Sequence, residues 1–320
     1  MRHLEREELG MNDMSHYQNL IPDSIDLSAY MEPEAKHHVR TVDHYRDGVL
    51  LHMLGEGEKT GRNLPFKSTH GKFQLRENEM TTWVGFKGHG KSAVISQVLV
   101  NCMAHNEPVF VISPEFTPVQ LLLRMIYQKL ITREPSAGEL KEWFEWAVKR
   151  LWLYDQQASI KPDDVPPLCR YVCEEFGIKH ILIDSLMKCG IAPDDYSRQK
   201  LFVDQVQNVA HNYPVHIHLV AHARKARDDS SVPSIHDIKG GSEIGDLVEN
   251  VIVVWRNKPK EIAQSMNDQA KYDEADAMLK VEAQRNADGW IGSVPLNFDK
   301  KSMRFYEIDE QPPEYEYVNF

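Results

Sequence analysis

Short apolar runs alternate with amphipathic segments over most of the chain. Apolar runs that end at polar or turn-forming residues predict buried strands at Thr81–Val84, Pro108–Ser113, His180–Asp184, Val215–Ala221 and Asn250–Trp255. Apolar positions that recur every three and four residues predict helices at Lys91–Ala104, Pro118–Thr132, Ala137–Lys149, Asp163–Phe176 and Arg198–Asn212. Such alternation is typical of a mainly parallel central sheet flanked by helices on both faces. The pattern therefore predicts an α/β fold.

The two ends of the chain follow other patterns. Residues 1–33 lack sustained periodicity, and we expect a flexible arm there. The segment Glu34–Leu54 predicts one amphipathic helix, followed by a loop from Gly55 to His70. This helix packs either on its own chain or on a neighbouring copy, and the pattern leaves both open. Near the other end, a meander of edge strands is predicted at Lys280–Arg285, Trp290–Phe298 and Ser302–Glu307.

Charge and composition narrow the possible functions. With 37 Lys and Arg against 48 Asp and Glu, the net charge of −11 excludes a surface that coats nucleic acid along its length, so any DNA contact has to be local. Neither an apolar run of about eighteen residues nor a signal or transit peptide is present, and we expect no membrane contact. The pair Cys169 and Cys173 lacks the second short-spaced pair of a zinc site, which favours reduced, partly buried thiols.

The strongest chemical signal is the sequence GFKGHGKS at residues 85–92, which matches G-x-x-x-x-G-K-[ST] between a predicted strand and a predicted helix. Its glycines let backbone N–H groups curl around phosphate oxygens. Lys91 reaches the β and γ phosphates, and Ser92 supplies a hydroxyl to Mg²⁺. The segment predicts a site for ATP or another NTP or dNTP with Mg²⁺. Its nucleotide-binding residues would be Gly85, Gly88, His89, Gly90, Lys91 and Ser92.

Polar residues at the carboxyl ends of predicted strands would complete this site. Asp184 ends the run HILID and suits Mg²⁺ binding, although a turn residue is the alternative. Glu115 could orient or deprotonate water, or else lie early in a helix and be stabilised by its dipole. His222 stands at a strand end where a γ-phosphate sensor could lie. His216 and His218 share one strand face without a third ligand nearby, which favours packing over metal binding.

The order of these features resembles the RecA-like motor domain of DnaB-type replicative helicases, most closely the phage helicase-primase and mitochondrial Twinkle branch. The motifs are the P-loop, HILID, HLVAHAR, DIKGGSEIGDLVENVIVVWRNK and EAQRNADGWIG, within roughly residues 72 to 307. The resemblance implies a ring, usually hexameric, that hydrolyses nucleotide at subunit boundaries and moves on single-stranded DNA. It also implies a cytoplasmic location in a bacterial or phage-infected cell.

Matching positions carry further roles by this resemblance. Glu115 would be the catalytic base, Asp184 the second-strand acid and His222 the sensor, where the DnaB branch commonly has Gln. Arg285 resembles the arginine finger that reaches into the neighbour's site, the alternative being a surface arginine at a strand end. Residues that would stack on the two faces of the base are Arg256 and Phe298. The DNA-binding loop of the central channel would be Lys239, Gly240, Gly241 and Ser242, the alternative being an ordinary glycine turn.

The chain also departs from the family pattern. Ala283 stands where a second cation often precedes the finger, and Lys280 or Lys258 could substitute for it. The stretch Lys258–Leu279 looks longer and more helical than usual. Upstream of the motor we expect only a linker helix that docks on the adjacent subunit, hence a helicase without a fused primase that works with a separate primase and polymerase.

These observations divide the chain into four expected parts. They are an arm at 1–33, a linker helix and connector at 34–71, a RecA-like ATPase domain at 72–308 and an acidic tail at 309–320. Two other functions stay open. One is a RecA- or KaiC-like ATPase that binds DNA or a protein partner without unwinding, and the other is an accessory or loader protein that uses nucleotide for assembly only.

Overall fold

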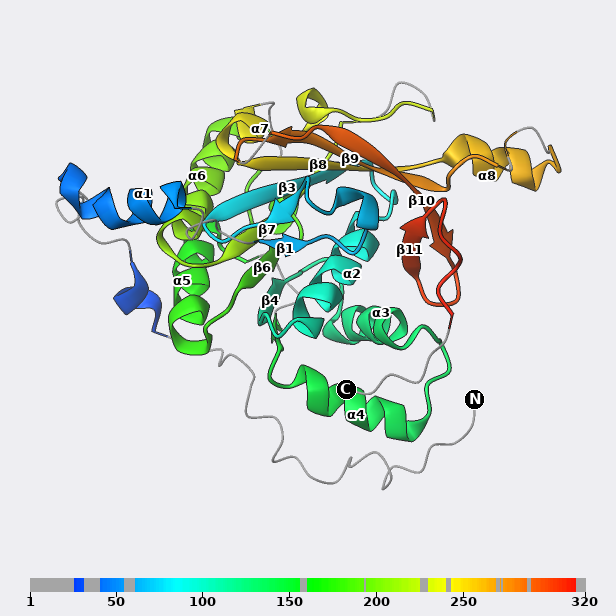
Figure 1. Ribbon diagram of the computed structural model, residues 1–320, viewed down its shortest axis with the longest axis horizontal. Coiled ribbons are helices and arrows are strands. Elements are labelled where there is room, and N and C mark those ends of the chain that lie inside the picture. Colours follow the sequence, from blue (N-terminus) through cyan, green and yellow to red (C-terminus); the bar gives the residue numbers. More distant parts are fainter. Residues whose placement is uncertain are drawn as a thin grey trace.

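The centre of the molecule is a nine-stranded sheet with the strand order β11-β10-β9-β8-β3-β7-β6-β4-β5 (Figure 1). The computed structural model describes residues 26–31, 41–54, 61–155, 160–192, 194–224, 230–239, 243–268, 271, 273–286 and 289–314. Six neighbouring strands run parallel: β3 (Glu79–Gly85), β4 (Val109–Ile112), β5 (Leu151–Tyr154), β6 (His180–Ile183), β7 (His216–His222) and β8 (Asn250–Arg256). An antiparallel meander then extends the sheet beyond β8: β9 (Ala277–Gln284), β10 (Gly292–Asp299) and β11 (Arg304–Glu307).

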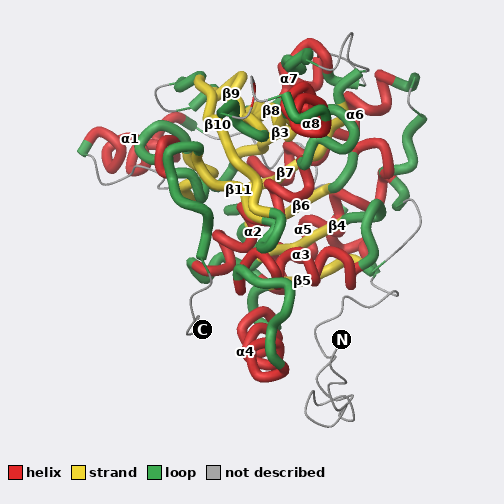
Figure 2. Tube along the Cα trace, turned by 90° about the vertical axis from the view of Figure 1, so that its right-hand side faces the viewer, coloured by secondary structure: helices red, strands yellow, loops and turns green. Residues whose placement is uncertain are grey.

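Helices cover both faces of the sheet, which explains why the inner parallel strands β3, β4 and β6 are buried along their whole length. One core cluster joins the sheet to α2 (Lys91–Ala104), α3 (Pro118–Leu130) and α4 (Ala137–Ala147). The other joins it to α5 (Val165–Phe176), α6 (Tyr196–Asn212) and α7 (Glu243–Leu247). Within β4, Val109 and Val111 belong to the first cluster and Phe110 and Ile112 to the second, as side-chain alternation along a strand requires. Figure 2 shows α4 outside the other helices, away from the sheet.

The predicted α/β fold class is confirmed, as are the five predicted inner strands and the helices between them. The sequence pattern missed β5, because its four residues Leu151–Tyr154 directly follow a helix and are too few for a periodic signal. In the meander, β9 begins at Ala277 rather than Lys280. The helical expectation after Lys258 holds only for α8 (Lys258–Ser265), which projects beyond the sheet in Figure 1.

The segment before the core is less regular than expected. Thr41 is extended, Val42–Tyr45 is a 3-10 turn and α1 spans Arg46–Met53, so the helix is shorter than predicted, while residues 34–40 lie outside the described part. The predicted loop up to His70 is wrong in its second half. Its residues form β1 (Arg62–Asn63), which pairs with β2 (Gln74–Leu75), and the 3-10 turn Lys67–Thr69. Two apolar side chains there are buried in the main core, which is why this stretch is ordered: Leu64 and Phe66.

Three further sequence expectations can be compared with the fold. Within the expected arm, residues 26–31 dock on α5: the Tyr30 carbonyl accepts from Arg170 Nη1 at 2.9 Å. The other arm residues, and residues 315–320 of the expected tail, lie outside the described part. All four cysteines are free, as expected, and three are buried: Cys102, Cys169 and Cys189. Every helix in the described ranges is too short or too polar to cross a lipid bilayer.

Candidate functional site

The loop between β3 and α2 has the backbone of a phosphate-binding loop. Gly88 and Gly90 have φ angles of +79° and +86°, a region that residues with a side chain rarely adopt. A Cβ atom on Gly85 would collide with the carbonyl oxygen of Val254 on the neighbouring strand β8. The glycines are therefore needed for the loop to fold, and the loop leads directly into the N-terminus of α2, where backbone N–H groups are free to bind an anion.

Lys91 lies at the centre of the site, held by three acceptors. Its Nζ donates to the carbonyl oxygens of Gly85 and Phe86 at 2.7 and 3.0 Å, and to His222 Nδ1 at 3.2 Å. Burial lowers the pKa of Lys91 to about 8. The ammonium group therefore connects the phosphate-binding loop with the carboxyl end of β7.

Glu115 is joined to Lys91 through His222. Because Lys91 donates to Nδ1, His222 carries a proton on Nε2, which faces Glu115 Oε1 at 3.4 Å. Ser185 Oγ donates to the same oxygen at 2.9 Å. The bond from His222, with help from Ser185, lowers the pKa of Glu115 to about 2 against the effect of burial. The carboxylate is therefore ionised at neutral pH, and it lies in the turn before the N-cap Thr117, not in α3.

Asp184 and Ser92 form the second half of the site. Ser92 Oγ donates to Asp184 Oδ2 at 2.8 Å. Asp184 is 2% exposed, and burial raises its pKa to about 6. Its other oxygen, Oδ1, is buried and has no hydrogen-bond partner among the described residues. An unpaired carboxylate oxygen beside a serine hydroxyl is a ligand set that suits Mg²⁺, so these two residues fit the metal that the P-loop implies.

His89, Arg256 and Phe298 lie around the same loop. His89 is buried, its Nδ1 accepts from the Arg256 backbone N–H at 3.1 Å, and burial lowers its pKa to about 4. The Arg256 side chain donates to the Gly88 carbonyl at 3.2 Å and forms an ion pair with Glu261 of α8. The Phe298 ring packs against Phe305, with ring centroids 4.9 Å apart. His89 thus belongs to the P-loop, and Arg256 contacts the loop directly. Phe298 is connected to it through Phe305, whose ring lies against Gly90.

Arg285 lies at the amino ends of the parallel strands, opposite to the end where the P-loop lies. Its backbone N–H donates to Glu249 O and its Nη1 to Leu247 O at 3.4 Å, both just before β8 begins. Arg256, near the P-loop, is at the other end of β8. Six residue steps along a strand span roughly 20 Å, so Arg285 cannot reach the P-loop of its own chain. Lys280 and Lys258 were suggested as substitutes for the second cation near the finger. Lys280 forms an ion pair with Glu282, and the charge of Lys258 helps to lower the pKa of His89 in its own chain.

Lys239 is exposed and directly connected to His222. Its backbone N–H donates to the His222 carbonyl oxygen at 2.8 Å, and Ala223 pairs with Ile238 in an isolated antiparallel bridge. The end of β7 is therefore hydrogen-bonded to Lys239, the first residue of the predicted DNA-binding loop. The rest of that loop, Gly240, Gly241 and Ser242, lies outside the described residues.

The sequence interpretation missed three residues at this site. Ser185 directly follows the carboxylate strand and binds Glu115. Arg124, on α3, is partly buried, and its buried Nε and Nη1 atoms are unpaired within the described part of the chain. Phe305 lies against the P-loop, since its Cζ would be 3.2 Å from a Cβ atom on Gly90. Local patterns do not reveal these residues, because each acts through a neighbour distant in sequence.

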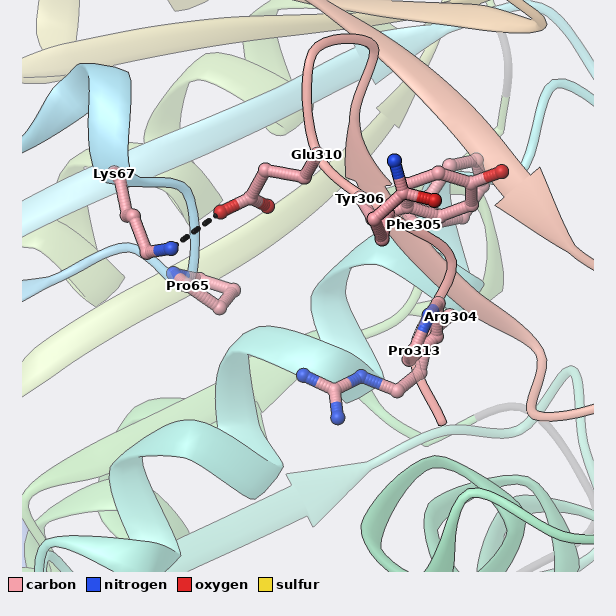
Figure 3. Close-up of a pocket in the computed structure, with 8 residues that line it drawn as sticks. Pro65, Lys67, Arg304, Phe305, Tyr306, Glu310 and Pro313 are labelled. Atoms are coloured by element: carbon pink, nitrogen blue, oxygen red, sulfur yellow. Dashed lines mark ion pairs between the residues drawn. The ribbon is translucent and has the colours of Figure 1, made fainter. Parts of the chain in front are cut away.

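Phe305 also lines a pocket of about 320 Å³ between the meander and the segment before the core. Figure 3 shows Lys67 and Glu310 pointing toward one another at this pocket, with their charged groups 2.7 Å apart. Because the Phe305 ring lines this pocket and also lies against Gly90, it separates the pocket from the P-loop.

A second group of ionisable residues lies at the amino ends of the strands. Ligand atoms of Cys102, Glu107 and His180 lie within 4.8 Å of one another, as in a metal site. However, His180 Nδ1 contacts His218 Nε2 at 3.2 Å, and His180 Nε2 contacts Glu107 Oε2 at 3.1 Å. Both ring nitrogens are thus engaged within the protein, and the sequence-based preference for packed histidines agrees with these contacts.

Comparisons with known proteins agree with this geometry. The model of the family "DnaB-like helicase C terminal domain" matches residues 69–307. The fold is similar to that of a DnaB-like replicative helicase, described together with its interactions with primase, with a TM-score of 0.66 and 14% identity over 84% of this chain and 67% of that one. It is also similar to a second solved structure, an ATPase domain, with a TM-score of 0.67 and 15% identity over 84% of this chain and 99% of that one. At these identities, the structural likenesses show a shared fold only.

Proposed function

Because the chain belongs to the DnaB-like helicase C-terminal domain family, we propose that it is an ATP-dependent DNA helicase that moves on single-stranded DNA as a ring. Family membership makes it a P-loop NTPase, and the proposal adds the coupling of hydrolysis to unwinding. The observation that carries it is the series of contacts from Lys91 through His222 to Glu115, together with the backbone bond from His222 to Lys239. These contacts link the proposed nucleotide site to Lys239, the first residue of the proposed DNA-binding loop.

In the proposed reaction, Glu115 is the general base. A water oxygen attacks the γ phosphorus, its proton passes to a Glu115 carboxylate oxygen, and the bond between the γ phosphorus and the β–γ bridging oxygen breaks to leave ADP and phosphate. When bound, Mg²⁺ neutralises charge on the β and γ phosphates, and Ser92 and Asp184 are the residues that would hold it. Lys91 exchanges its three acceptors within the protein for phosphate oxygens.

The same exchange would signal the nucleotide state. When the Lys91 ammonium group moves to the phosphates, His222 Nδ1 loses its hydrogen-bond donor. The ring can then change its position according to whether the γ phosphate is present. Any shift of His222 is transmitted to Lys239, because its carbonyl oxygen holds the Lys239 N–H. One lysine with adjacent glycine backbone can bind a sugar-phosphate chain without reading its bases, as a translocating motor requires.

The position of Arg285 supports the proposed ring. Since it lies roughly one strand length of about 20 Å from its own P-loop, we propose that it acts as an arginine finger in the neighbouring subunit's site. Apolar side chains of α1 that are exposed in the single chain are proposed to dock on the adjacent subunit; these are Val49, Leu50 and Met53. A hexamer is the proposed ring size, and a separate primase and polymerase are the proposed partners, the primase by analogy with the DnaB-like helicase described with its primase.

The proposal is tested by ATP hydrolysis with and without single-stranded DNA. We expect DNA to raise hydrolysis several-fold in the unchanged protein. Lys239→Ala should remove this stimulation and keep the basal rate, because Lys239 lies outside the nucleotide site. Lys141→Ala is the matched control, since this lysine is 68% exposed on the outer helix α4. Hydrolysis that is indifferent to DNA, or equally stimulated in Lys239→Ala, contradicts the proposal.

Oligomerisation is tested separately. Native mass measured with a non-hydrolysable nucleotide and an oligonucleotide should reveal a ring, and a forked duplex should be unwound. Arg285→Ala should lower turnover by about 10³ to 10⁵-fold. Mixing Arg285→Ala with Glu115→Gln should restore part of the activity, because a mixed ring contains sites with an intact base and an intact finger. A protein that hydrolyses ATP as a monomer contradicts the ring.

A further inference from the structure

Two buried side chains near the nucleotide site, and a third that is partly buried, carry buried polar atoms that the described residues leave unpaired. They come from the end of β4, from α3 and from the end of β6: Ser113 Oγ, Arg124 Nε and Nη1, and Asp184 Oδ1. Burying a polar group without a partner costs on the order of 1 to 3 kcal/mol, and more for a charged group. Mg²⁺ would account for Asp184 Oδ1 but not for Ser113 Oγ or the Arg124 N–H groups, so these two side chains indicate an additional ligand.

Ser113 and Asp184 are neighbours on adjacent strands. Ile112 on β4 is aligned with Ile183 on β6, and the Asp184 N–H donates to the Ile112 carbonyl oxygen at 2.9 Å. Both isoleucines belong to the core cluster on the α5 and α6 face. Because side chains alternate, the next residue on each strand faces α2 and α3 instead. The bond from Ser92 on α2 to Asp184 agrees with this direction.

Arg124 approaches the same place from α3. A capping box of Thr117 and Gln120 fixes where this helix begins. The Arg124 guanidinium lies over the Phe116 ring, with its Cζ 4.6 Å from the ring centroid, beside Glu115. Burial lowers the pKa of Arg124, and the Asp184 carboxylate opposes this lowering, so the two charges are close enough to interact although they form no direct ion pair.

We propose that Ser113, Arg124 and Asp184 enclose an ordered water, and that Arg124 acts through this water as a positioning residue for Asp184. A buried water typically makes about three hydrogen bonds to groups that are otherwise unsatisfied, which is the number of side chains available here. The water accepts from Arg124 and donates to Asp184 Oδ1, while the Ser113 hydroxyl completes its shell. This inference rests on the proposed function, since Asp184 is there a residue that would hold Mg²⁺.

The consequence is a selective effect on metal-dependent binding. Replacing a group that orients a metal ligand typically weakens metal affinity by about 10 to 100-fold. Arg124→Met removes the charge and the N–H groups but keeps the length of the side chain. The affinity for a fluorescent ATP analogue in Mg²⁺ should therefore fall about 10-fold or more. In EDTA the affinity should change less than about twofold, because the P-loop itself is untouched.

Companion variants separate this role from a merely structural one. Arg124→Lys keeps the charge and should recover part of the Mg²⁺-dependent affinity. Ser113→Ala should weaken it in the same direction by a smaller factor. Arg133→Met is the matched control, because Arg133 is an exposed arginine that follows the same helix and stacks on Tyr127. Thermal unfolding without nucleotide identifies any variant that is not folded, and Ser113→Ala then carries the test.

The outcomes are distinguishable. If the unchanged protein binds no nucleotide in Mg²⁺, the proposed function itself fails. If it binds, but the Arg124 and Ser113 variants behave like Arg133→Met, or lose equal affinity in Mg²⁺ and in EDTA, the positioning role is wrong. A crystal structure that resolves ordered water should contain one within hydrogen-bond distance of Arg124 and Asp184 Oδ1, and its absence there overturns the proposal.

Discussion

Two histidine–glutamate pairs lie at opposite ends of the same parallel strands. At the carboxyl ends, His222 faces Glu115 at 3.4 Å, and at the amino ends His180 faces Glu107 at 3.1 Å. The pKa of each glutamate is lowered to about 2, mainly by hydrogen bonds that outweigh burial. The two pairs therefore look alike in residue type, distance and charge. Their difference lies in the groups that surround them.

The pair at the amino ends belongs to a closed chain of hydrogen bonds. Trp83 Nε1 donates to His218 Nδ1 at 3.2 Å, so the neutral His218 ring donates from Nε2 to His180, and His180 in turn donates to Glu107. Arg62 binds both oxygens of Glu107, at 2.9 and 2.7 Å. The indole that begins this chain is fully buried in the core and cannot leave. This pair is therefore structural.

The pair at the carboxyl ends belongs to a chain that can open. It begins at the Lys91 ammonium group, which a phosphate could attract away, and it ends at Glu115, which is held by one serine rather than by an arginine. The two glutamates are equally exposed, at 25% and 24%, but the His222 side chain is 21% exposed against 4% for His180. The same residue pair thus serves structure or chemistry according to whether its partners can be exchanged.

The largest expected difference between the pairs is in catalysis. Glu115→Gln should lower ATP turnover by about 10² to 10⁴-fold, because the amide cannot accept the proton of water. Nucleotide binding, measured by fluorescence, should persist. Glu107→Gln, assayed at a temperature where it is folded, should hydrolyse at nearly the rate of the unchanged protein. Equal losses in the two variants would remove the distinction.

Replacing Glu107 should lower the stability of the fold more than replacing Glu115, which is the reverse of their order in catalysis. Glu107→Ala leaves the Arg62 guanidinium and the buried His180 without an acceptor, so the free energy of unfolding should fall by about 1 to 3 kcal/mol, a range reduced for the partial exposure of the ion pair. Glu115→Ala should change it by less than about 1 kcal/mol. Urea unfolding of the two variants measures this difference, and a greater loss in Glu115→Ala contradicts it.

The free energy of unfolding should depend on pH through the histidines at the amino ends of the strands. Burial lowers the pKa of His216 to about 3 and that of His218 well below 6.5, so both stay neutral in the folded protein. Below pH 6.5 only the unfolded chain takes up these protons, and the free energy of unfolding should fall as pH decreases, by up to about 1.4 kcal/mol per pH unit for each histidine. Between pH 6.5 and 4.5, His89 adds to this decline because burial lowers its pKa to about 4, and Asp184 opposes it because burial raises its pKa to about 6. The two glutamates contribute only below that range.

The control for this titration is His216→Asn, whose amide can still donate to the Arg76 carbonyl that His216 Nδ1 contacts at 2.6 Å. Its unfolding free energy should depend less steeply on pH between 6.5 and 4.5. An unchanged slope would mean that His216 is not held neutral.

The smallest expected effect concerns Ser185. Ser185→Ala removes one hydrogen bond to Glu115, worth about 0.5 to 1.5 kcal/mol, so turnover should fall roughly 2 to 10-fold. Steady-state kinetics should show this loss in kcat with little change in KM. Thr81→Val removes a hydroxyl from His216 at the other end of the sheet and should leave kcat unchanged. A loss of kcat in Thr81→Val would mean that the amino ends of the strands also affect catalysis, which contradicts the distinction between the two pairs.

Local patterns along the chain were enough to predict the fold class and half of the site. Lys91 and Ser92 belong to a contiguous motif, and Asp184 and His222 end apolar strands, so motif spacing and the rule that parallel strands end together were sufficient to find them. The five inner strands and the helices between them were recognisable for a similar reason: burial on both faces leaves a continuous apolar run, and helical periodicity separates one run from the next.

Which of the two similar pairs is free to react became visible only in the folded molecule. Glu107 precedes the strand Val109–Ile112 and Glu115 follows it, which was enough to favour Glu115 as the base, but the order along the chain does not reveal which partners hold each carboxylate. Arg62 reaches Glu107 across 45 residues, and Trp83 reaches His218 across 135. Arg124 likewise comes close enough to Asp184 to interact with it only in the folded chain. Hydrogen-bond saturation depends on contacts between distant segments, and these contacts exist only in the folded chain.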